Sequence, residues 1–427
     1  MKLRTTGRKK ILSIFDMIQV KNVQTITGQT INHTIQSKED TTIDATGLTL
    51  LPALIDPHVH FRVPGWEHKE DWRHGAQAAI AGGVTTVFDM PSGIPSCTTF
   101  ERFYEKESLI NQQLQEVGIP LHYRLYLGAD KESFGEIKQT KNKCIGIKVF
   151  LGSSIGNLLI DNISDFEKIC VLSAEYHLVV AVHGEDDATL KQTKKIRVER
   201  SNAPIVVTEH SILRPREAAI TAVKNAIRMS EQHGTRMYLL HMTTREEVAL
   251  VREAKQRGLP VFAEITPHHL FLNDSAYEKL GTFAQMNPPL RTKEDQEALW
   301  EGVRNGTIDT IGTDHAPHTR EEKAQPYGKA PSGVPGIETM LPLLLTAYHE
   351  GKITLKKIVE LTHENPQKIF GLEPNDDVVL VNLNKKKTVR NEELKTKCGW
   401  SPFNGWELTG WPVYTVCKGR VFKLKTD

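Results

Sequence analysis

Two histidines one residue apart close an apolar run in the stretch LPALIDPHVHFRVPG, residues 51–65, and an arginine follows them. Alternation along a β-strand places His58 and His60 on the same face. Imidazole is the commonest protein ligand for metals, so this pair could hold a metal ion. Four further residues suited to a metal site lie at or near the ends of similar segments: Lys148, His183, His241 and Asp314. The chemistry that these residues indicate is a metal centre built from several strand ends.

Such a centre needs a scaffold that brings separate strand ends together. Between residue 53 and about residue 370, short β-rich segments alternate with amphipathic helical stretches such as REAAITAVKNAIRMSEQHG. The β-rich segments are ALIDPHVH, VTTVFDM, HYRLYLG, IGIKVFL, LVVAVH, RMYLLH, LPVFAEI and DTIGTD. This alternation predicts an α/β fold of the (β/α)8 TIM-barrel type, in which the carboxyl ends of the strands form the active-site face. All the candidate ligands would then meet at the barrel mouth.

The segments that flank the predicted barrel differ from it in character. Residues 1–52 and 371–427 contain short alternating strands and polar turns, and we expect them to pair into one small β-sandwich domain built from both termini. The barrel domain would span residues 53–370. The apolar patch ILSIFDMI, residues 11–18, is predicted as the first strand and not as a signal peptide, because Asp16 interrupts it and no cleavage site follows.

Composition limits the partners and the compartment. The chain has 427 residues and a net charge of +2, and its basic residues are dispersed except at Lys2, Arg4, Arg8, Lys9 and Lys10. We therefore expect a small-molecule substrate and no nucleic-acid partner. Five cysteines without a CxxC pair favour reduced thiols in a cytoplasmic protein. No apolar run approaches the roughly 20 residues of a membrane span, and a homodimer is a common arrangement by base rate.

Each ligand candidate also has an ordinary structural interpretation. A single histidine at a strand end is more often a structural or surface residue than a ligand. Lys148 could extend along apolar surface to reach a salt bridge, and Asp314 could cap the turn that follows it. The joint placement of four histidines and an aspartate at equivalent strand ends is harder to explain in these ways. It favours the metal centre.

A set of segments in chain order carries a family resemblance. DPHVHFR, GIKVFLGSS, AVHGED, LHMTTREE, AEITPHHL, MNPPLR, GTDHAPH and APSGVPGIET resemble the dihydroorotases of the cyclic amidohydrolase superfamily. The resemblance runs from the β-segment before His58 to the closing CGWSPFNGW and covers most of the chain. A bare HxH pair is weak evidence, whereas the ordered set HxH, Lys, His, His and Asp is strong evidence for the superfamily. MNPPLR and GTDHAPH point to dihydroorotase within it.

The resemblance implies two zinc ions and the reversible cyclisation of N-carbamoyl-L-aspartate to L-dihydroorotate, with loss of water, in pyrimidine biosynthesis. The implied ligands are His58, His60 and Asp314 for the first ion, and His183 and His241 for the second. Lys148 would bridge both ions as N6-carboxylysine, because an ammonium group cannot ligate whereas a carbamate is an anionic bridge. Asp314 would also be the catalytic acid and base.

The resemblance also implies a substrate subsite beside the metal ions. Its residues are Arg62, Ser92, Asn287, His318, Ser332 and Gly333. Arg62 would hold the substrate carboxylate through a bidentate guanidinium, with further hydrogen bonds from Asn287 and His318. The backbone around Ser332 and Gly333 would hold the amide edge of the ring.

Three of these substrate contacts have ordinary alternatives. Arg62 could pair with Glu67 or Glu70, Asn287 could cap its loop, and His318 could face solvent. The motifs around these residues favour the functional role, most clearly for the arginine and the histidine. Where each side chain lies in the fold decides between the two interpretations.

Two positions depart from the family pattern. Val63 stands where a glutamate commonly follows the arginine, and Ser92 in MPSGIP stands where an asparagine usually contacts the substrate carboxylate. Serine keeps one donor but loses the two-ended geometry of the amide. Loss of one buried hydrogen bond would weaken binding by about 1 to 3 kcal/mol. We therefore expect weakened or altered substrate binding before any loss of chemistry.

Two other functions stay open at this point. A hydantoinase or allantoinase would present the same metal ligands, but Arg62 and His318 suit a ring that carries a carboxylate, and a neutral ring would leave buried cations unpaired. A non-catalytic dihydroorotase-like scaffold would be expected to lose ligands, and every candidate ligand position is filled here. The metal is open as well, because imidazole and carboxylate ligands accept zinc, cobalt or manganese.

Overall fold

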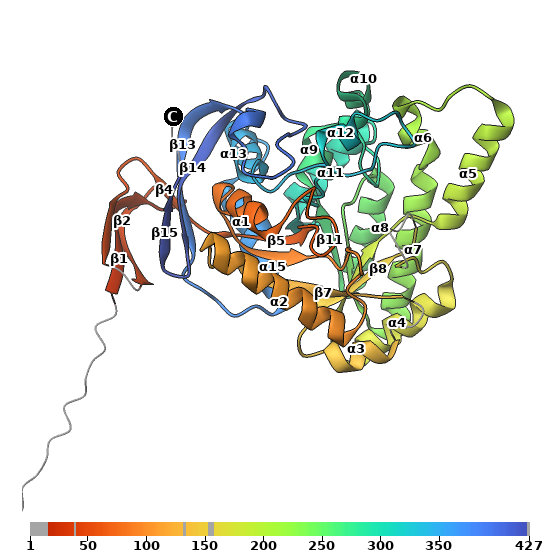
Figure 1. The fold of residues 1–427 in the computed structure, drawn as a ribbon, viewed down its shortest axis with the longest axis horizontal. Coiled ribbons are helices and arrows are strands. Elements are labelled where there is room, and N and C mark those ends of the chain that lie inside the picture. The colour runs from red at the N-terminus through yellow and green to blue at the C-terminus, as the bar shows by residue number, and fades with distance from the viewer. Residues whose placement is uncertain (1–15, 38–39, 131–133, 153–157, 425–427) are drawn as a thin grey trace, which may run out of the picture.

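The computed structural model describes residues 16–37, 40–130, 134–152 and 158–424. Its larger part is a parallel barrel surrounded by helices, and a separate sheet lies beside the barrel (Figure 1). The N-terminal basic cluster and most of the predicted first strand fall in residues 1–15, outside the described residues. In the part of the chain that is described, no helix combines the length and the apolar character needed to cross a bilayer.

The barrel strands are those that the apolar segments predicted. They are β5 (Leu54–Val59), β6 (Val84–Asp89), β7 (His122–Gly128), β8 (Gly146–Phe150), β9 (Val179–His183), β10 (Arg236–Leu239), β11 (Val261–Ile265) and β12 (Thr310–Ile311). Neighbouring strands pair in parallel, in chain order from β5 to β12. Most of their residues are buried, and burial on both faces explains why these segments read as apolar runs. The TIM-barrel prediction is confirmed.

The barrel closes between its first and last strands. A parallel bridge joins Val59 to His315, and the His60 amide donates to the His315 carbonyl at 2.8 Å. The Asp56 carboxylate adds a link, because it accepts from the Thr313 amide at 2.9 Å. Closure therefore sets the residues that follow β5 against the residues that follow β12, at the mouth where metal ligands were predicted.

Helices cover the outside of the barrel (Figure 1). They are α1 (Trp72–Ala81), α2 (Phe100–Val117), α3 (Phe134–Thr140), α4 (Ile163–Glu175), α5 (Asp187–Arg200), α6 (His210–Leu213), α7 (Arg216–His233), α8 (Arg245–Gln256), α9 (Pro267–Phe271), α10 (Ala276–Leu280), α11 (Lys293–Asn305), α12 (Arg320–Lys323), α13 (Met340–His349), α14 (Leu355–Val359) and α15 (Asn365–Phe370). Shorter turns lie at Val207–Glu209, Gly281–Ala284, Glu360–Glu364 and Asn391–Glu393. Threonine side chains cap α2 and α11 at Thr99 and Thr292. The helix predicted over residues 216–234 is α7, which ends at Gly234 with φ of 69°.

Apolar and aromatic side chains fill the barrel interior. Their cluster is Ile55, Phe88, Met90, Tyr126, Val179, Ala181, Tyr238, Leu240, Ile369 and Phe370. Phe370 packs edge-on against Phe88 and Tyr238, with ring centroids 4.9 and 5.0 Å apart. The Tyr238 hydroxyl in turn donates to the Glu264 carboxylate at 2.8 Å. The packed core thus positions a buried carboxylate close to the predicted metal ligands.

The separate sheet is built from both ends of the chain, as predicted. Its strands are β1 (Asp16–Gln24), β2 (Thr30–Ser37), β3 (Thr41–Asp44), β4 (Thr49–Pro52), β13 (Val378–Thr388), β14 (Glu407–Cys417) and β15 (Arg420–Lys423). The strands of the expected sandwich form one seven-stranded sheet, in which β13 from the second half pairs with β4 from the first. Val20, Leu380 and Val416 belong to an apolar cluster of its own. This cluster stabilises the sheet separately from the barrel.

The terminal sheet is joined to the barrel at several points. Strand β14 runs beside α13, and the Thr415 hydroxyl donates to the Ile80 carbonyl at the end of α1 at 2.8 Å. The Ala53 amide, between β4 and β5, donates to the Asp377 carbonyl at 3.0 Å. These bonds tie the two parts of the chain together at the outer, amino-terminal end of the barrel.

Candidate active site

The predicted site residues surround one cavity at the mouth of the barrel. Its volume is about 330 Å³. Its wall includes His58, His60, Arg62, Ser92, Lys148, His183, His241, Asn287, Asp314, His318, Ser332 and Gly333. Phe150, Ala316 and Pro331 complete the wall. The structure therefore brings together every residue that the sequence singled out for the metal centre and the substrate subsite.

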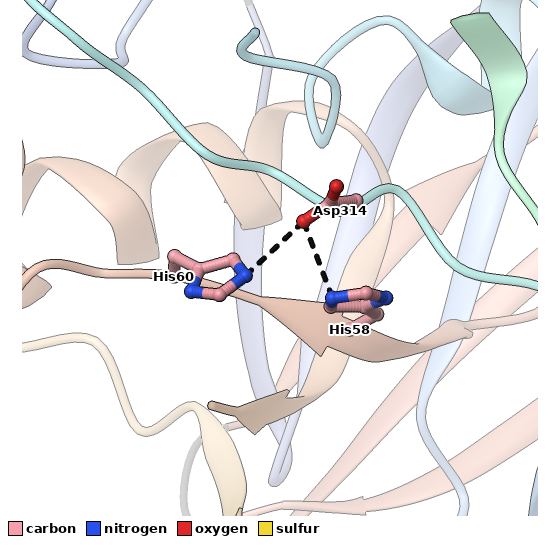
Figure 2. A group of neighbouring side chains, drawn as sticks. All are labelled: His58, His60 and Asp314. Carbon is pink, nitrogen blue, oxygen red and sulfur yellow. Dashed lines mark ion pairs between the residues drawn. The ribbon is translucent and has the colours of Figure 1, made fainter. Parts of the chain in front are cut away.

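One group of ligand atoms lies where the end of β5 meets the segment after β12. His58 Nε2 is 3.2 Å from Asp314 Oδ1, and His60 Nε2 is 3.1 Å from the same oxygen (Figure 2). The ligand atoms of the three residues all lie within 4.8 Å of one another. Two imidazole nitrogens and a carboxylate oxygen converge here as ligands of one metal ion do.

A second group lies after β9 and β10. His183 Nδ1 and His241 Nε2 face each other at 3.0 Å, and both side chains are buried. Burial is the main cause that lowers the pKa of His183 and that holds the pKa of His241 well below its usual value. Metal ligation requires neutral imidazole, so the environment keeps both rings in the form that can bind an ion.

Lys148 enters the same cavity from β8. Its side-chain nitrogen is buried and has no hydrogen-bond partner among the described residues, and it lies 4.5 Å from the centroid of the Phe150 ring. Burial lowers the pKa of Lys148 to about 7, although the negative charges of Asp314 and Glu264 act in the opposite direction. A large share of this side chain is therefore neutral amine near neutral pH. Neutral amine is the form that reacts with electrophiles such as carbon dioxide.

Two buried carboxylates hold the histidines from behind, and the sequence interpretation missed both. Glu264 on β11 lies 2.8 Å from His58 Nδ1, and Glu185 lies 2.9 Å from His183 Nε2. Each contact fixes one ring nitrogen and directs the other into the cavity. Sequence signals for both exist, because Glu264 is the one charged residue of the apolar segment VFAEI and Glu185 follows His183 by two positions.

The two carboxylates differ in their electrostatic surroundings. Burial raises the pKa of Glu264 to about 8. Burial would also raise the pKa of Glu185, but the charge of Arg214 and the contact with His183 together lower it. Arg214 Nε donates to Glu185 Oε1 at 3.0 Å. Glu185 is therefore an anion that favours a proton on His183 Nε2 and leaves Nδ1 free to face His241.

Three site residues hold a backbone conformation that residues other than glycine rarely adopt. The φ angle is 63° for Arg62, 37° for His241 and 45° for Asp314. Such conformations cost on the order of 1 to 3 kcal/mol each and persist only where the surrounding structure enforces them. Barrel closure and the buried carboxylates supply that constraint. Three of the six non-glycine residues with positive φ in the described chain therefore belong to the cavity wall.

Arg62 and His318 form the basic side of the cavity. Arg62 Nε donates to the Pro317 carbonyl at 3.0 Å, and its terminal nitrogen lies 3.1 Å from His318 Nε2. Lys69 Nζ lies 3.1 Å from His318 Nδ1 and can donate to it. If Nδ1 accepts from Lys69, the ring proton is on Nε2, which lies 3.1 Å from the Ser332 carbonyl. With a proton on Nε2, the Arg62 terminal nitrogen makes no hydrogen bond to it, and the two side chains lie side by side, each held by a backbone carbonyl.

The ordinary interpretations of the substrate residues do not fit their surroundings. Arg62 is buried and forms no ion pair with Glu67 or Glu70 among the described residues, and both carboxylates accept from backbone amides. Asn287 Oδ1 is buried with no hydrogen-bond partner in the described chain, so it caps nothing there. His318 is only 3% exposed and does not face solvent. These side chains are available for a ligand.

The loop that carries Ser332 and Gly333 is fixed by a neighbouring glutamine. Gln285 Nε2 donates to Ser332 Oγ at 3.0 Å, and the Gly333 amide donates to the Gln285 carbonyl at 3.0 Å. Gly333 has a φ of 137°, and a Cβ atom there would lie 2.5 Å from the Ala316 carbonyl oxygen. Only glycine fits this position. The Gly333 amide is already used and the Ser332 carbonyl contacts His318 Nε2, so a substrate would reach the Gly333 carbonyl directly and the Ser332 carbonyl only in place of that contact.

A buried lysine and a tryptophan from the C-terminal segment support the same loop. Lys323 Nζ donates to the carbonyls of Gln285 and Pro331, both at 2.9 Å. It lies 5.9 Å from the ring centroid of Trp400. Trp400 Nε1 donates to the His318 carbonyl at 2.7 Å. A segment close to the end of the chain therefore fixes one of the two basic residues of the cavity.

The two departures from the family pattern have different locations. Ser92 is 5% exposed and belongs to the cavity wall. Val63 is fully buried in the main apolar core and does not reach the cavity wall. Only the serine can therefore change the contacts that a bound ligand makes.

Comparison with known proteins gives a consistent family assignment. The Amidohydrolase family matches residues 49–422. The chain is 35% identical to a dihydroorotase of Methanosarcina mazei over 409 residues, which is 91% of this chain and 87% of that protein. It is 37% identical to a dihydroorotase of Halobacterium salinarum over 384 residues, which is 87% of this chain and 85% of that protein.

Solved structures with the same fold are named hydantoinases and dihydropyrimidinases. An L-hydantoinase (dihydropyrimidinase) from Arthrobacter aurescens superimposes with a TM-score of 0.88 at 26% identity, and the match covers 97% of each chain. A dihydropyrimidinase from Brevibacillus agri superimposes with a TM-score of 0.82 at 26% identity, over 95% of this chain and 94% of that one. With the family matched over most of its length, this chain belongs to the amidohydrolase family.

Proposed function

We propose that this protein is a dihydroorotase, which interconverts N-carbamoyl-L-aspartate with L-dihydroorotate and water in pyrimidine biosynthesis. The observation that carries the proposal is one cavity that combines the histidine cluster with the buried Arg62 and His318. The cluster suits hydrolysis of a cyclic amide, and the basic pair suits a ring that carries a carboxylate. Relatives named dihydroorotase, at 34% to 37% identity, support the same function.

The donor set fits a pair of divalent metal ions. We assign His58, His60 and Asp314 to one ion and His183 with His241 to the other. The facing nitrogens of the second group, 3.0 Å apart, are suited to binding a shared cation. Two bound ions would activate water and polarise the scissile carbonyl. Zinc is the ion that we propose, because it favours imidazole and carboxylate ligands in catalytic sites.

We propose that Lys148 is carboxylated and that its carbamate would help to hold both ions. Its amine is buried, unpaired in the described chain and held at a pKa of about 7. Attack of the neutral amine on carbon dioxide forms a nitrogen–carbon bond and releases one proton. The resulting carbamate carries two oxygens and a negative charge, which offsets the charge of two buried dications. An unmodified ammonium at this position would instead repel them.

Asp314 is the residue to which we assign proton transfer. In the hydrolytic direction it would take a proton from the attacking water and deliver it to the ring nitrogen, and in the cyclisation direction it would do the reverse. Its side chain is only 11% exposed and contacts both His58 and His60. That confinement keeps the carboxylate within the cavity, where the transferred proton is shielded from bulk water.

The basic side of the cavity would bind the substrate carboxylate. Arg62 would supply the guanidinium and His318 the Nε2 hydrogen, which would exchange its contact with Ser332 for the substrate. The unpartnered amide oxygen of Asn287 would accept from a substrate nitrogen. Ser92 would reach the substrate directly or through a water molecule. Because the Ser92 side chain is short, we expect it to bind the substrate more weakly than an asparagine would.

The cellular form of the enzyme is also a proposal. All five cysteines are free and buried in the structure, which is consistent with a protein that folds without disulfides. We propose a cytoplasmic homodimer. Light scattering of the purified protein would report the subunit number, and a monomer at micromolar concentration would count against the dimer.

A hydantoinase-like hydrolase of neutral rings is the second candidate. The superposition on an L-hydantoinase, with a TM-score of 0.88, and the serine at position 92 favour it. A neutral ring would give the buried guanidinium of Arg62 no carboxylate to bind, so only the charges of Asp314, Asp89 and Glu322 would offset its burial. A non-catalytic scaffold is less favoured than either, since the ligand-type residues all line the cavity.

A side-by-side assay tests the proposal. The zinc-loaded protein would be given L-dihydroorotate, N-carbamoyl-L-aspartate, hydantoin and allantoin, and the rates compared. We expect turnover of the first two only. Turnover of the neutral rings in preference would support the second candidate, and no turnover by protein with bound metal would support the scaffold.

A further inference from the structure

Three side chains with metal-ligating atoms meet at the end of the barrel opposite the candidate active site. They are His122, which begins β7, Asp377, which precedes β13, and Cys417, which ends β14. Their ligand atoms all lie within 4.8 Å of one another. We propose that they form a structural site for a divalent metal ion, best matched by zinc, at the junction of the barrel and the terminal sheet.

The histidine and the aspartate have the spacing of two ligands on one ion. His122 Nε2 lies 3.2 Å from Asp377 Oδ2, yet neither atom has a hydrogen-bond partner in the described chain. Ligands that bind zinc tetrahedrally at about 2.0 to 2.1 Å lie roughly 3.3 Å from each other. Asp377 is only 4% exposed, and a buried carboxylate oxygen whose close contact with His122 lacks hydrogen-bond geometry is poorly compensated. A metal ion between the two atoms would remove that cost.

The other contacts of Asp377 and Cys417 leave one carboxylate oxygen and the sulfur able to bind the ion. The Lys418 amide donates to Asp377 Oδ1 at 2.7 Å, so Oδ2 is the free oxygen. The Cys417 thiol is buried and donates to the Pro120 carbonyl at 3.3 Å. When the ion binds, the thiol releases its proton to solvent and a sulfur–metal bond replaces this weak hydrogen bond. One thiolate and one carboxylate then balance the charge of a dication, and no redox change is involved.

The open side of the site can supply a fourth ligand. A cavity of about 420 Å³ is lined by His122, Glu107, Arg124 and Lys418, among others, and the histidine side chain is 25% exposed. Water from this cavity would complete a tetrahedral set of three protein ligands. The same opening provides a route for the ion and for the released proton.

The position of the site suggests what it does. His122 belongs to the barrel, whereas Asp377 and Cys417 belong to the terminal sheet. At the amino-terminal end of barrel strands, residues serve stability more often than catalysis. An ion bound by both parts would stabilise the folded chain and hold the sheet against the barrel, because it binds the folded state and not the unfolded one.

Cobalt spectroscopy tests the proposal, because the ligands that we assign in the active site contain no sulfur. The metal-free full chain would be titrated with Co²⁺, and the near-ultraviolet sulfur-to-cobalt charge-transfer band would be recorded. We expect a band whose final intensity corresponds to one cobalt–thiolate site per chain, reached once the two active-site positions and this site are filled. It should disappear in Cys417→Ser and in His122→Ala, and persist in Cys144→Ser, a matched variant of another buried cysteine. Turnover of L-dihydroorotate by wild type and His122→Ala should be alike.

Two results would overturn the site. The first is wild-type protein that shows the visible bands of cobalt but no charge-transfer band. The second is a band that survives in both His122→Ala and Asp377→Asn. His122→Ala changes a partly exposed side chain, so it is expected to fold even if Cys417→Ser does not. Zinc should also raise the thermal midpoint of the wild type more than that of His122→Ala. Each of these readings is independent of the proposed catalytic activity.

Discussion

Replacement of Lys323 by methionine would test whether a buried cation beneath the substrate loop limits stability near neutral pH. The Lys323 side chain is fully buried. Burial, and secondly the charge of Arg62, lowers the pKa of Lys323 from 10.5 to about 7. Methionine keeps the length and the apolar stem of lysine. It loses the hydrogen bonds to the Gln285 and Pro331 carbonyls.

The sign and size of the effect follow from proton linkage. The unfolded chain holds the lysine proton up to a pH of about 10.5, whereas the folded protein releases it near pH 7. Between these values the unfolded state binds more protons, so the free energy of unfolding rises with pH. The rise is about 1.4 kcal/mol per pH unit. Lys323 therefore lowers wild-type stability most at and below pH 7, by about 5 kcal/mol, and this penalty fades toward pH 10.5.

Denaturant unfolding of wild type and Lys323→Met at several pH values would measure this effect. The quantity to compare is the wild-type minus variant difference in unfolding free energy, because other titrating groups then largely cancel. We expect this difference to rise by about 1.4 kcal/mol for each pH unit above 7. Lys191→Met is the control, since the side chain of Lys191 is 71% exposed.

A difference that stays constant with pH would refute the reasoning, because it would mean that Lys323 keeps its proton in the folded protein. The Lys323→Met variant should also change the kinetic constants for L-dihydroorotate. Loss of the two carbonyl contacts would loosen the loop of Ser332 and Gly333, so KM for L-dihydroorotate should rise more than kcat falls. Equal effects on both would place the role of Lys323 outside substrate binding.

The remaining predictions concern the cavity itself. Asp314→Asn should reduce kcat by on the order of 10² to 10⁴, because the proton-transfer group is lost, and near-normal turnover with an unchanged circular dichroism spectrum would contradict the assigned role. Lys148→Ala should lose bound metal and activity together, as measured by elemental analysis and rate, and short carboxylic acids should restore part of both; full metal content without the lysine would argue against a bridging carbamate. Ser92→Asn should lower KM for L-dihydroorotate about tenfold by restoring one buried hydrogen bond, whereas an unchanged KM would show that the cavity is shaped around serine.

The barrel and the ligand-type residues that line its cavity could be predicted from local sequence. Each barrel strand is a short apolar run, because both of its faces are buried, and the candidate ligands His58, His183 and Asp314 stand at or just after the ends of such runs. In a TIM barrel the carboxyl ends of all the strands lie at one face, so the residues at those ends come together. No long-range information beyond the fold class was needed to place these residues in one cavity.

The residues that the sequence did not identify act through contacts between distant segments. Glu264 holds His58 across 206 positions of the chain, and Lys323 reaches the Gln285 carbonyl across 38. The spacing of these pairs follows no helical or strand period. Likewise, His122 and Asp377 become neighbours only when β13 joins the sheet beside the barrel. Such pairings depend on the packed fold: the sequence marks Glu264 as a charged residue in an apolar run, but it does not identify His58 as its partner.

The hydrogen bond from Trp400 to the His318 carbonyl makes the substrate side of the cavity depend on a segment near the chain terminus. During synthesis all the barrel strands, and with them all the candidate metal ligands, leave the ribosome before the segment that contains Trp400. The hydrogen bond from Trp400 to the His318 carbonyl can form only after residue 400 has emerged. A nascent chain could thus fold its metal centre before it can select a substrate. In evolutionary terms, exchange of the C-terminal segment between relatives would alter substrate recognition without changing a metal ligand.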